Sequence, residues 1–449
     1  MSGAIIDFFP QTNHLKGNYV RLGLVSRIFS GGTPDKGNLD YWEGGDIPWI
    51  GSGEVNQGIV QNPTAHITRQ AVERSATKLF PKDSLIMALA GQGKTKGTVA
   101  RMGIDAYGNQ SLGCISDYSG ESRFLYWWLT SLYREIRNLS SQETRDGLNQ
   151  SMLGQIPVPL FDLATQRQIA DFLDRETARI DLLIEKKQRL VALLAERQVE
   201  ALEAAVLGGA NVQRGNGGEW LSDLAQGWRF IPLKHFVSSK GGATPSKDRD
   251  DFWVGEIPWV SPKDMKVDVI EDVPDHVSEA AVKGSALSLI PEGAVLIVVR
   301  GMILARYVPV CRLGCEGTIN QDMKALISDN RVASSEYLQL MLQGFSSVLM
   351  TFVEEAAHGT KKLRSDQLFN MKFPVPPLDV QAGIIRNYLA MRDHNKSLQE
   401  KTNSSIDHLK EYRSALITAA VTGQIDVTTY AKSGTPDRHL DAIQEEMGA

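Results

Sequence analysis

Two long segments of the chain carry apolar residues at helical spacing and contain almost no residues that break helices. The segment from Gln166 to Gly208 has no proline and no interior glycine, and only Gly383 interrupts the segment from Gln381 to Gly423. Each segment therefore predicts a single helix of roughly 60 Å at the standard rise per residue, unusually long for a globular protein. The repeating apolar positions are Leu173, Ile180, Leu183, Leu190 and Leu194 in the first helix and Leu398, Ile406, Leu409, Tyr412 and Leu416 in the second.

These apolar positions leave the charged residues on the remaining faces of both helices. The pattern is typical of a coiled-coil seam. The alternative is that each helix packs separately on its own globular part, but the matching spacing in the two segments favours pairing. If the helices pair antiparallel, the globular parts lie at opposite ends of the pair and are related by a pseudo-twofold axis.

The rest of the chain has a different texture. From about 17 to 160 and from 228 to 378, short β-branched or aromatic runs alternate with Gly, Pro, Asn and Asp. Such runs are typical of strands joined by turns, so each segment predicts an α/β (α+β) globular domain with much irregular structure.

The two halves of the chain repeat one another. Gly31-Gly32-Thr33-Pro34 matches Gly242-Ala243-Thr244-Pro245 at an offset of 211, and Asn109-Gln110 matches Asn320-Gln321 at the same offset. Asp46-Ile47-Pro48-Trp49 matches Glu256-Ile257-Pro258-Trp259 at 210, and Pro157-Val158-Pro159 matches Pro374-Val375-Pro376 at 217. A duplicated unit of one globular domain and one helix therefore accounts for nearly the whole chain.

This repeat predicts the order of domains along the chain. The predicted parts are an N-terminal segment (1–16), a first globular domain (17–160), a first helical region (161–210), a linker (211–227), a second globular domain (228–378), a second helical region (379–424) and a C-terminal tail (425–449).

Composition narrows the class of protein. Of the 449 residues, 42% are hydrophobic and 22% are charged, which is ordinary globular usage and excludes a fully disordered chain. No apolar run approaches the roughly 20 residues of a membrane-spanning helix. Three cysteines are too few for a disulfide framework. We therefore expect a cytoplasmic protein with no membrane partner.

The charge is distributed unevenly. A net charge of −5 excludes a uniformly basic nucleic-acid binder, but not one whose basic surface is confined to one face. Between Arg69 and Arg101, seven basic residues accompany only two acidic ones, and further basic residues gather near Arg300 and Lys361. Such loops suit phosphate, and Arg, Gln and Asn side chains can also read base edges. The alternative is a solvated surface whose charges cluster by chance.

One segment resembles a nucleotide-binding motif. Residues 88–95 nearly match the phosphate-binding loop, with alanine in place of its first glycine. Residues 96–100 are poor helix starters, although such a loop needs a helix N-terminus, and the second copy, 300–306, has no Gly-Lys-Thr. Cys311 and Cys315 lack the spacing and partners of a zinc site. We therefore expect neither catalytic nor metal-binding chemistry from this chain alone.

Aromatic residues occupy matching places in both copies, at Tyr41-Trp42, Trp49, Phe252-Trp253 and Trp259. A core role is favoured, because the ring of Ile-Pro-Trp at a strand edge is expected to pack inward. Stacking on bases is the alternative.

Together, these features resemble the specificity subunit of a Type I restriction-modification system. The resemblance rests on Gly-Gly-Thr-Pro-Asp at 31–35, Asp-Ile-Pro-Trp at 46–49, the strand and glycine loop at 85–94, Asn-Gln at 320–321, and the Pro-Val-Pro-Leu run at 157–160 that leads to Gln166 and its helix. It implies two target recognition domains that each read half of a split double-stranded DNA sequence. It also implies two helices that pack antiparallel and set the spacer between the halves.

The resemblance further implies partners and cofactors. Two methyltransferase (modification) subunits would use S-adenosylmethionine to methylate adenine, and restriction subunits with motor and nuclease activity would use ATP and Mg. This chain would be non-catalytic and hold no cofactor. The alternatives are a self-contained DNA-modifying enzyme and a two-headed scaffold that binds only proteins. The candidate DNA contacts are Arg69, Gln92, Lys94, Thr95, Lys96, Arg101, Lys263, Arg300, Arg306, Lys324, Lys361, Lys362 and Arg364.

Overall fold

The chain forms two compact units in the computed structural model. The first unit contains Met1–Arg189 and Lys401–Ala449, and the second contains Leu190–Glu400. The structure describes residues 8–15, 18–91, 93–140, 147–207, 213–214, 220–221, 226–356 and 359–432, together with 434, 438 and 440.

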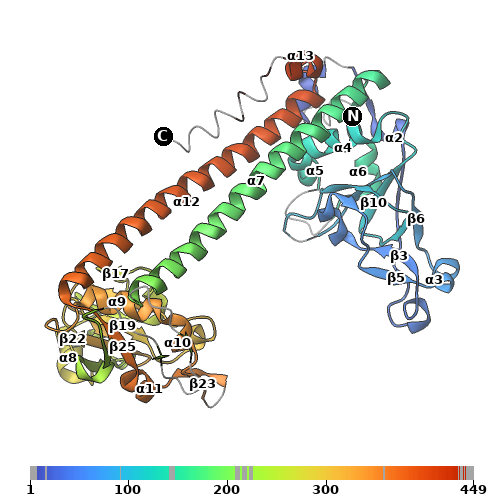
Figure 1. Ribbon diagram of the computed structural model, residues 1–449. Helices are drawn as coiled ribbons and strands as arrows, with labels where there is room; N and C mark the ends of the chain where they lie inside the picture. Colours follow the sequence, from blue (N-terminus) through green and yellow to red (C-terminus); the bar gives the residue numbers. More distant parts are fainter. Residues whose placement is uncertain are drawn as a thin grey trace. The chain divides into compact units, whose positions relative to one another are not determined.

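The first unit is built from two sheets and a two-stranded ribbon (Figure 1). The five-stranded sheet runs in the order β2 (Arg27–Ser30), β10 (Leu112–Ser116), β7 (Leu85–Ala88), β8 (Val99–Met102) and β4 (Ile59–Val60). The four-stranded sheet runs β5 (Ala65–Ile67), β3 (Ile47–Ile50), β9 (Ala106–Gly108) and β6 (Lys78–Phe80), and the ribbon pairs β1 (Tyr19–Arg21) with β11 (Pro157–Pro159). The short helices are α2 (Leu22–Val25), α3 (Arg69–Arg74), α4 (Ser122–Ser131), α5 (Tyr133–Asn138), α6 (Gln150–Gly154) and α13 (Val427–Lys432).

The second unit repeats this plan. Its five-stranded sheet runs β15 (Val237–Gly241), β22 (Met323–Ser328), β19 (Val295–Val298), β20 (Val310–Leu313) and β17 (Val269–Ile270). The other strands are β18 (His276–Val277), β16 (Ile257–Val260) and β21 (Thr318–Ile319) in one sheet, and the pairs β14 (Arg229–Pro232) with β25 (Lys372–Val375), β23 (Val353–Glu355) with β24 (Lys361–Leu363), and β12 (Gln213–Arg214) with β13 (Trp220–Leu221). The short helices are α8 (Glu279–Gly284), α9 (Ser335–Gly344), α10 (Ser346–Met350) and α11 (Ser365–Asn370).

The middle strand of each five-stranded sheet is an uninterrupted apolar run, and its position explains why. All four residues of β7 are buried. Leu85 and Met87 pack with the residues of α4, whereas Ile86 and Ala88 pack with those of β3 and the loop after it. Because successive side chains of a strand point to opposite faces, a strand covered on both faces must be apolar at every position. Strand β19 is likewise fully buried.

The two long helices are α7 (Leu163–Val206) and α12 (Leu378–Val421). Both begin three residues before the predicted start. Just before α7, the Asp162 carboxylate accepts a hydrogen bond of 2.9 Å from the Thr165 amide. This bond satisfies a backbone donor of the first turn, a capping contact that apolar spacing alone does not predict. The predicted end at Gly208 lies outside the described residues. Gly423, with φ of 70°, follows the end of α12, as a helix-terminating glycine does.

In the first unit, α7 and α12 pack antiparallel. Asp181 of α7 is 2.9 Å from Arg413 of α12, and Phe172, earlier in α7, contacts Tyr430, beyond the end of α12. The predicted seam residues that are buried there are Leu173, Ile180, Ile406, Leu409 and Leu416. Leu183, Leu190, Leu194 and Leu398 are half-buried.

Candidate nucleic-acid interface

The loops of the five-stranded sheet in the first unit meet at one end of its strands. Because the pairs β2–β10, β10–β7 and β7–β8 are antiparallel, the ends of β2 and β7 lie beside the starts of β10 and β8. The Leu89 amide donates to the Ser111 carbonyl over 2.8 Å, and the Gly32 amide donates to the Gly108 carbonyl over 2.8 Å. We call residues 31–33, 89–98 and 109–111 the first loop edge.

The loop at 89–98 connects the antiparallel strands β7 and β8, and no helix follows it. It therefore lacks the helix N-terminus on which a phosphate-binding loop depends. Lys94 is exposed and Thr95 half-buried, and the Tyr133 hydroxyl donates to the Lys94 carbonyl over 2.7 Å. Lys96 donates to the Ser140 hydroxyl over 2.5 Å. Gln92, a predicted DNA contact, lies outside the described residues.

The corresponding edge of the second unit joins two basic clusters that lie far apart in the sequence. Arg300 and Lys362 face each other in an isolated antiparallel bridge. The Gly301 amide donates to the Lys361 carbonyl over 2.9 Å, and the Arg300 amide donates to the Asp322 carbonyl over 3.2 Å. We call residues 242–244, 299–306, 320–322 and 361–362 the second loop edge.

Several predicted cations already have carboxylate partners. The pairs are Lys361 with Glu355 at 2.7 Å, Arg364 with Asp366 at 3.1 Å, Lys263 with Asp275 at 2.5 Å and Arg69 with Glu73 at 3.2 Å. Among the described residues, no carboxylate pairs with Lys94, Arg300, Arg306, Lys324 or Lys362. These five side chains can neutralise an anionic ligand without first breaking an ion pair.

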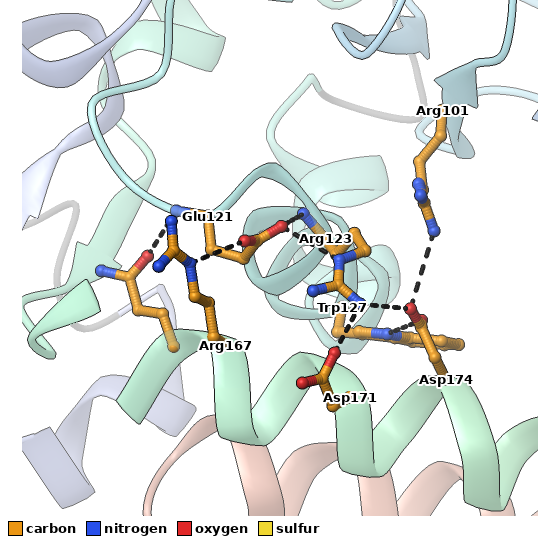
Figure 2. A network of polar contacts seen from close by, with 8 residues as sticks. Arg101, Glu121, Arg123, Trp127, Arg167, Asp171 and Asp174 are labelled. Atoms are coloured by element: carbon orange, nitrogen blue, oxygen red, sulfur yellow. Dashed lines mark hydrogen bonds and ion pairs between the residues drawn. The ribbon is translucent and has the colours of Figure 1, made fainter. Parts of the chain in front are cut away.

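Arg101 is not part of the first loop edge. Its Nη1 lies 3.9 Å from Asp174 on α7, within the polar network of Figure 2. At the centre of this network, Arg123 of α4 lies 2.7 Å from Asp171 and 3.2 Å from Asp174. Burial opposes the charge of Arg123, but hydrogen bonds to Asp171 and Glu121 raise its pKa. The network fastens α4 and β8 to α7, so Arg101 has a structural partner here.

Sequence reasoning missed a polar pair that recurs at both edges. The Thr33 hydroxyl donates to the Gln110 side-chain oxygen, and the Thr244 hydroxyl donates to that of Gln321. Both glutamines are exposed. The signal was present in the sequence, because both partners repeat at the offset of 211 that defines the duplication.

The repeated tryptophans hydrogen-bond to the backbone of both loop edges. The Trp49 indole donates to the Gly32 carbonyl over 3.3 Å, and the Trp259 indole donates to that of Ala243 over 3.0 Å. Trp49 and Trp259 are at most 9% exposed, and each packs edge to face on Trp42 or Trp253. This placement favours the core role over base stacking.

Burial keeps two cysteine thiols outside the loop edges protonated. Burial raises the pKa of both Cys114 and Cys311 to about 12. Within the part of the chain that the structure describes, no three His, Cys, Asp or Glu side chains group closely enough to ligate a metal ion. No helix in that part combines the length and apolarity required for a membrane span.

A family model and several curated relatives match the chain. The model, described as Type I restriction modification DNA specificity domain, matches residues 16–192 and 225–406. Over 277 residues the chain is 30% identical to the Type I restriction enzyme EcoR124I/EcoR124II specificity subunit of Escherichia coli, covering 59% of this chain and 61% of the relative. Over 188 residues it is 26% identical to the Type I restriction enzyme MjaIX specificity subunit of Methanocaldococcus jannaschii, covering 40% and 42%. Each match spans less than two thirds of the relative.

Two solved structures share the fold at 17% identity. One belongs to work on complex assembly and conformational transition of the type I R-M system, and it aligns with a TM-score of 0.67 over 91% of this chain and 98% of that chain. The other is the HsdS subunit from Thermoanaerobacter tengcongensis, which aligns with a TM-score of 0.53 over 91% and 97%.

Proposed function

The chain belongs to the Type I restriction-modification DNA specificity family, and we propose from this premise that its two units each read one half of a bipartite double-stranded DNA target. The chain itself would catalyse nothing. It would select the sequence on which partner subunits act.

The loop edges carry this proposal. Each unit presents, at the same end of the same sheet, a basic loop beside a Thr–Gln pair whose glutamine is exposed. Lys94 on the first edge, and Arg300, Arg306 and Lys362 on the second, are exposed without an ion pair among the described residues. Cations that contact phosphates position a protein on DNA, whereas polar groups that reach base edges specify the sequence.

The two edges differ in their loops, which favours two unlike half-sites. The first carries Gly91-Gln92-Gly93-Lys94-Thr95, whereas the second carries Arg300-Gly301-Met302-Ile303-Leu304 and the basic strand β24 beside it. Arginine pairs best with guanine and glutamine with adenine in the major groove. Sequence readout is therefore expected to come from the segments that the repeat has not kept.

We further propose that α7 and α12 set the spacer between the half-sites and dock two methyltransferase subunits. S-adenosylmethionine would be held by those subunits, and ATP and Mg by restriction subunits. The proposal places the cofactors in the partners, because the family's relatives here are specificity subunits.

The test is to express the chain with its methyltransferase subunit, purify the complex and map methylated adenines on plasmid DNA by single-molecule sequencing. We expect methylation confined to one two-part sequence. Replacing Lys94 and Lys96, or Arg300 and Arg306, with alanine should weaken DNA binding and reduce its salt dependence, since fewer counterions are released.

Lys283→Ala is the matched control, because Lys283 is exposed on α8 and paired with Glu279 at 2.9 Å. It should leave methylation unchanged. Methylation without sequence preference, or a complex that binds no DNA, would favour the alternative of a two-headed scaffold that binds only proteins. Methyl transfer by the chain alone would support a self-contained enzyme.

A further inference from the structure

The Thr–Gln pairs are the same in two units whose neighbouring loops differ. Thr33 and Gln110 recur as Thr244 and Gln321 with the same hydrogen bond. The basic loops beside them share neither length nor sequence. A feature kept in both copies cannot distinguish one half-site from the other. If it contacts DNA, it therefore contacts something that both half-sites possess.

The backbone beneath each pair is built to hold it in place. A Cβ on Gly31 would lie 1.8 Å from the Gly108 carbonyl oxygen, and one on Gly242 would lie 2.1 Å from that of Asn320. The strands therefore approach closely only because these residues are glycine. The Asn109 side chain accepts from the Ser111 amide over 3.0 Å, and that of Asn320 accepts from the Asp322 amide over 3.0 Å.

Each pair leaves hydrogen-bond donors on an exposed glutamine. Because the glutamine oxygen accepts from the threonine hydroxyl, the glutamine amide group retains two N–H donors. No residue that the structure describes accepts a hydrogen bond from the amide nitrogen of Gln110 or Gln321. An exposed donor group that is held by its bond to threonine, and that has no acceptor among the described residues, is suited to an oxygen acceptor on a ligand.

The pairs also lie directly beside the basic loops. On the first edge, the Leu89 amide that opens the loop donates to the Ser111 carbonyl over 2.8 Å. On the second, the Val299 amide donates to the Asp322 carbonyl over 2.8 Å. Gln110 and Gln321 each immediately precede the accepting residue, so an anion held by the loop would lie close to the glutamine.

We propose that the Thr33–Gln110 and Thr244–Gln321 pairs each bind a phosphate of the DNA backbone and fix the register in which the neighbouring loop meets the bases. This inference rests on the proposed function. Both half-sites possess phosphates whatever their sequence, and amide side chains are common phosphate contacts. Gln110 and Gln321 are thus positioning residues, and the loops determine specificity.

The test compares Gln110→Ala, Gln321→Ala and the nearly isosteric Gln110→Glu in the purified complex with its methyltransferase subunit. Gln61→Ala is the control, because Gln61 is exposed beyond the opposite end of β8 from the loop edge. The probes are a duplex with the mapped target and duplexes in which one half-site is scrambled. Affinity is measured over a series of salt concentrations.

We expect each alanine variant to weaken binding to all duplexes by the same factor, about fivefold to tenfold for the loss of one hydrogen bond. The methylated motif and the salt slope should not change, since glutamine releases no counterion. Gln110→Glu should weaken binding more than Gln110→Ala, because a carboxylate repels phosphate. Gln61→Ala should bind as the parent does.

Two results would overturn the inference. Relaxed methylation at one position of a half-site would show that the glutamine reads a base. Affinities within twofold of the parent for all three edge variants would show that the pairs do not contact DNA. In either case the parent's specific binding would still support the proposed function, which fails separately if the parent complex has no sequence preference.

Discussion

Single glycines decide how closely the strands approach at the loop edges. Gly241 and Gly242 are adjacent, yet a Cβ on Gly241 would meet nothing within 4 Å, whereas one on Gly242 would lie 2.1 Å from backbone. The contrast separates a steric requirement from the general flexibility of glycine, which both residues share.

We predict that Gly242→Ala lowers the free energy of unfolding of the second unit by about 1–3 kcal/mol, the usual cost of overpacking. Gly241→Ala, the matched control, should be neutral or slightly stabilising, because it only restricts the unfolded chain. Urea unfolding followed by hydrogen exchange in each unit measures both. Equal effects of the two substitutions would contradict the steric explanation.

The cysteines provide a second test on individual side chains. Thiolates react with disulfide reagents, and burial raises the pKa of Cys114 and Cys311 to about 12. At pH 8 we therefore expect Cys315, which is half-buried, to react first and the other two only after unfolding. Thiol titration with and without denaturant decides this.

The same thiols should make stability depend on alkaline pH. In the unfolded chain a cysteine loses its proton near its ordinary pKa of about 8.5, whereas the folded protein keeps it until about pH 12. The contribution of these thiols to the free energy of unfolding is therefore fully present below about pH 8.5 and is lost as the pH rises above it. Cys114→Ala with Cys311→Ala should flatten this decline, and an unchanged slope would contradict it.

At the level of elements, polar contacts fasten each globular region to a long helix with opposite polarity in the two units. In the first unit, α7 supplies the carboxylates Asp171 and Asp174 to Arg123 (Figure 2). In the second, α12 supplies the cation, and Arg392 lies 2.6 Å from Asp268. The fold repeats, but the charges that hold the long helix to the globular region do not.

We predict that Arg123→Ala destabilises the first unit by about 1–3 kcal/mol, because it leaves three carboxylates without their shared partner. The Arg123 side chain is only 28% exposed. Arg69→Ala is the control, since Arg69 is 84% exposed and its pair with Glu73 should contribute under about 0.5 kcal/mol. Unit-resolved hydrogen exchange measures both, and similar losses would argue against the network.

A double-mutant cycle tests the reversed contact in the second unit. Asp268→Asn and Arg392→Gln should each destabilise it, and the double variant should cost less than the sum by about 0.5–1 kcal/mol. Both side chains remain partly exposed, at 49% and 29%, which keeps the coupling modest. Strict additivity in urea unfolding would show that the two groups do not interact.

The sequence predicted those elements whose cause is local. The long helices follow from apolar spacing and absent breakers, and buried β7 and β19 follow from unbroken apolar runs. The sequence did not predict the contacts between distant segments. The bridge between Arg300 and Lys362 unites residues of two separate sequence clusters, and the ion pair of Arg101 with Asp174 joins residues 73 positions apart along the chain. Pairing across such distances depends on strand register, which composition does not encode.

For the chain as a whole, the duplication separates what the fold requires from what varies. The five-stranded sheet has the same strand order in both units. The Thr–Gln pair recurs, as does the bond from a tryptophan indole to the loop at 31–34 or 242–245. The loops at 89–98 and 299–306 differ. Under the proposed function, the repeated parts position DNA and the variable loops choose its sequence, so the two halves can diverge without loss of the scaffold.

The last prediction concerns the helices that both units share. Seven residues inserted after Leu190 in α7 and after Glu400 in α12 would lengthen both helices by about 10 Å and return the seam to nearly the same face. If the helices set the spacer, the complex should then methylate a target whose halves lie about three base pairs further apart, at about 3.4 Å per base pair.

A four-residue insertion in both helices adds about 6 Å, or roughly two base pairs, but rotates the seam by about 40°. It should shift the spacer less and bind more weakly. An insertion in α7 alone is the control, because it puts the seam out of register and should impair assembly. If the paired seven-residue variant folds, assembles and still methylates only the parent spacer, the separation of the half-sites is set by the partner subunits rather than by these helices.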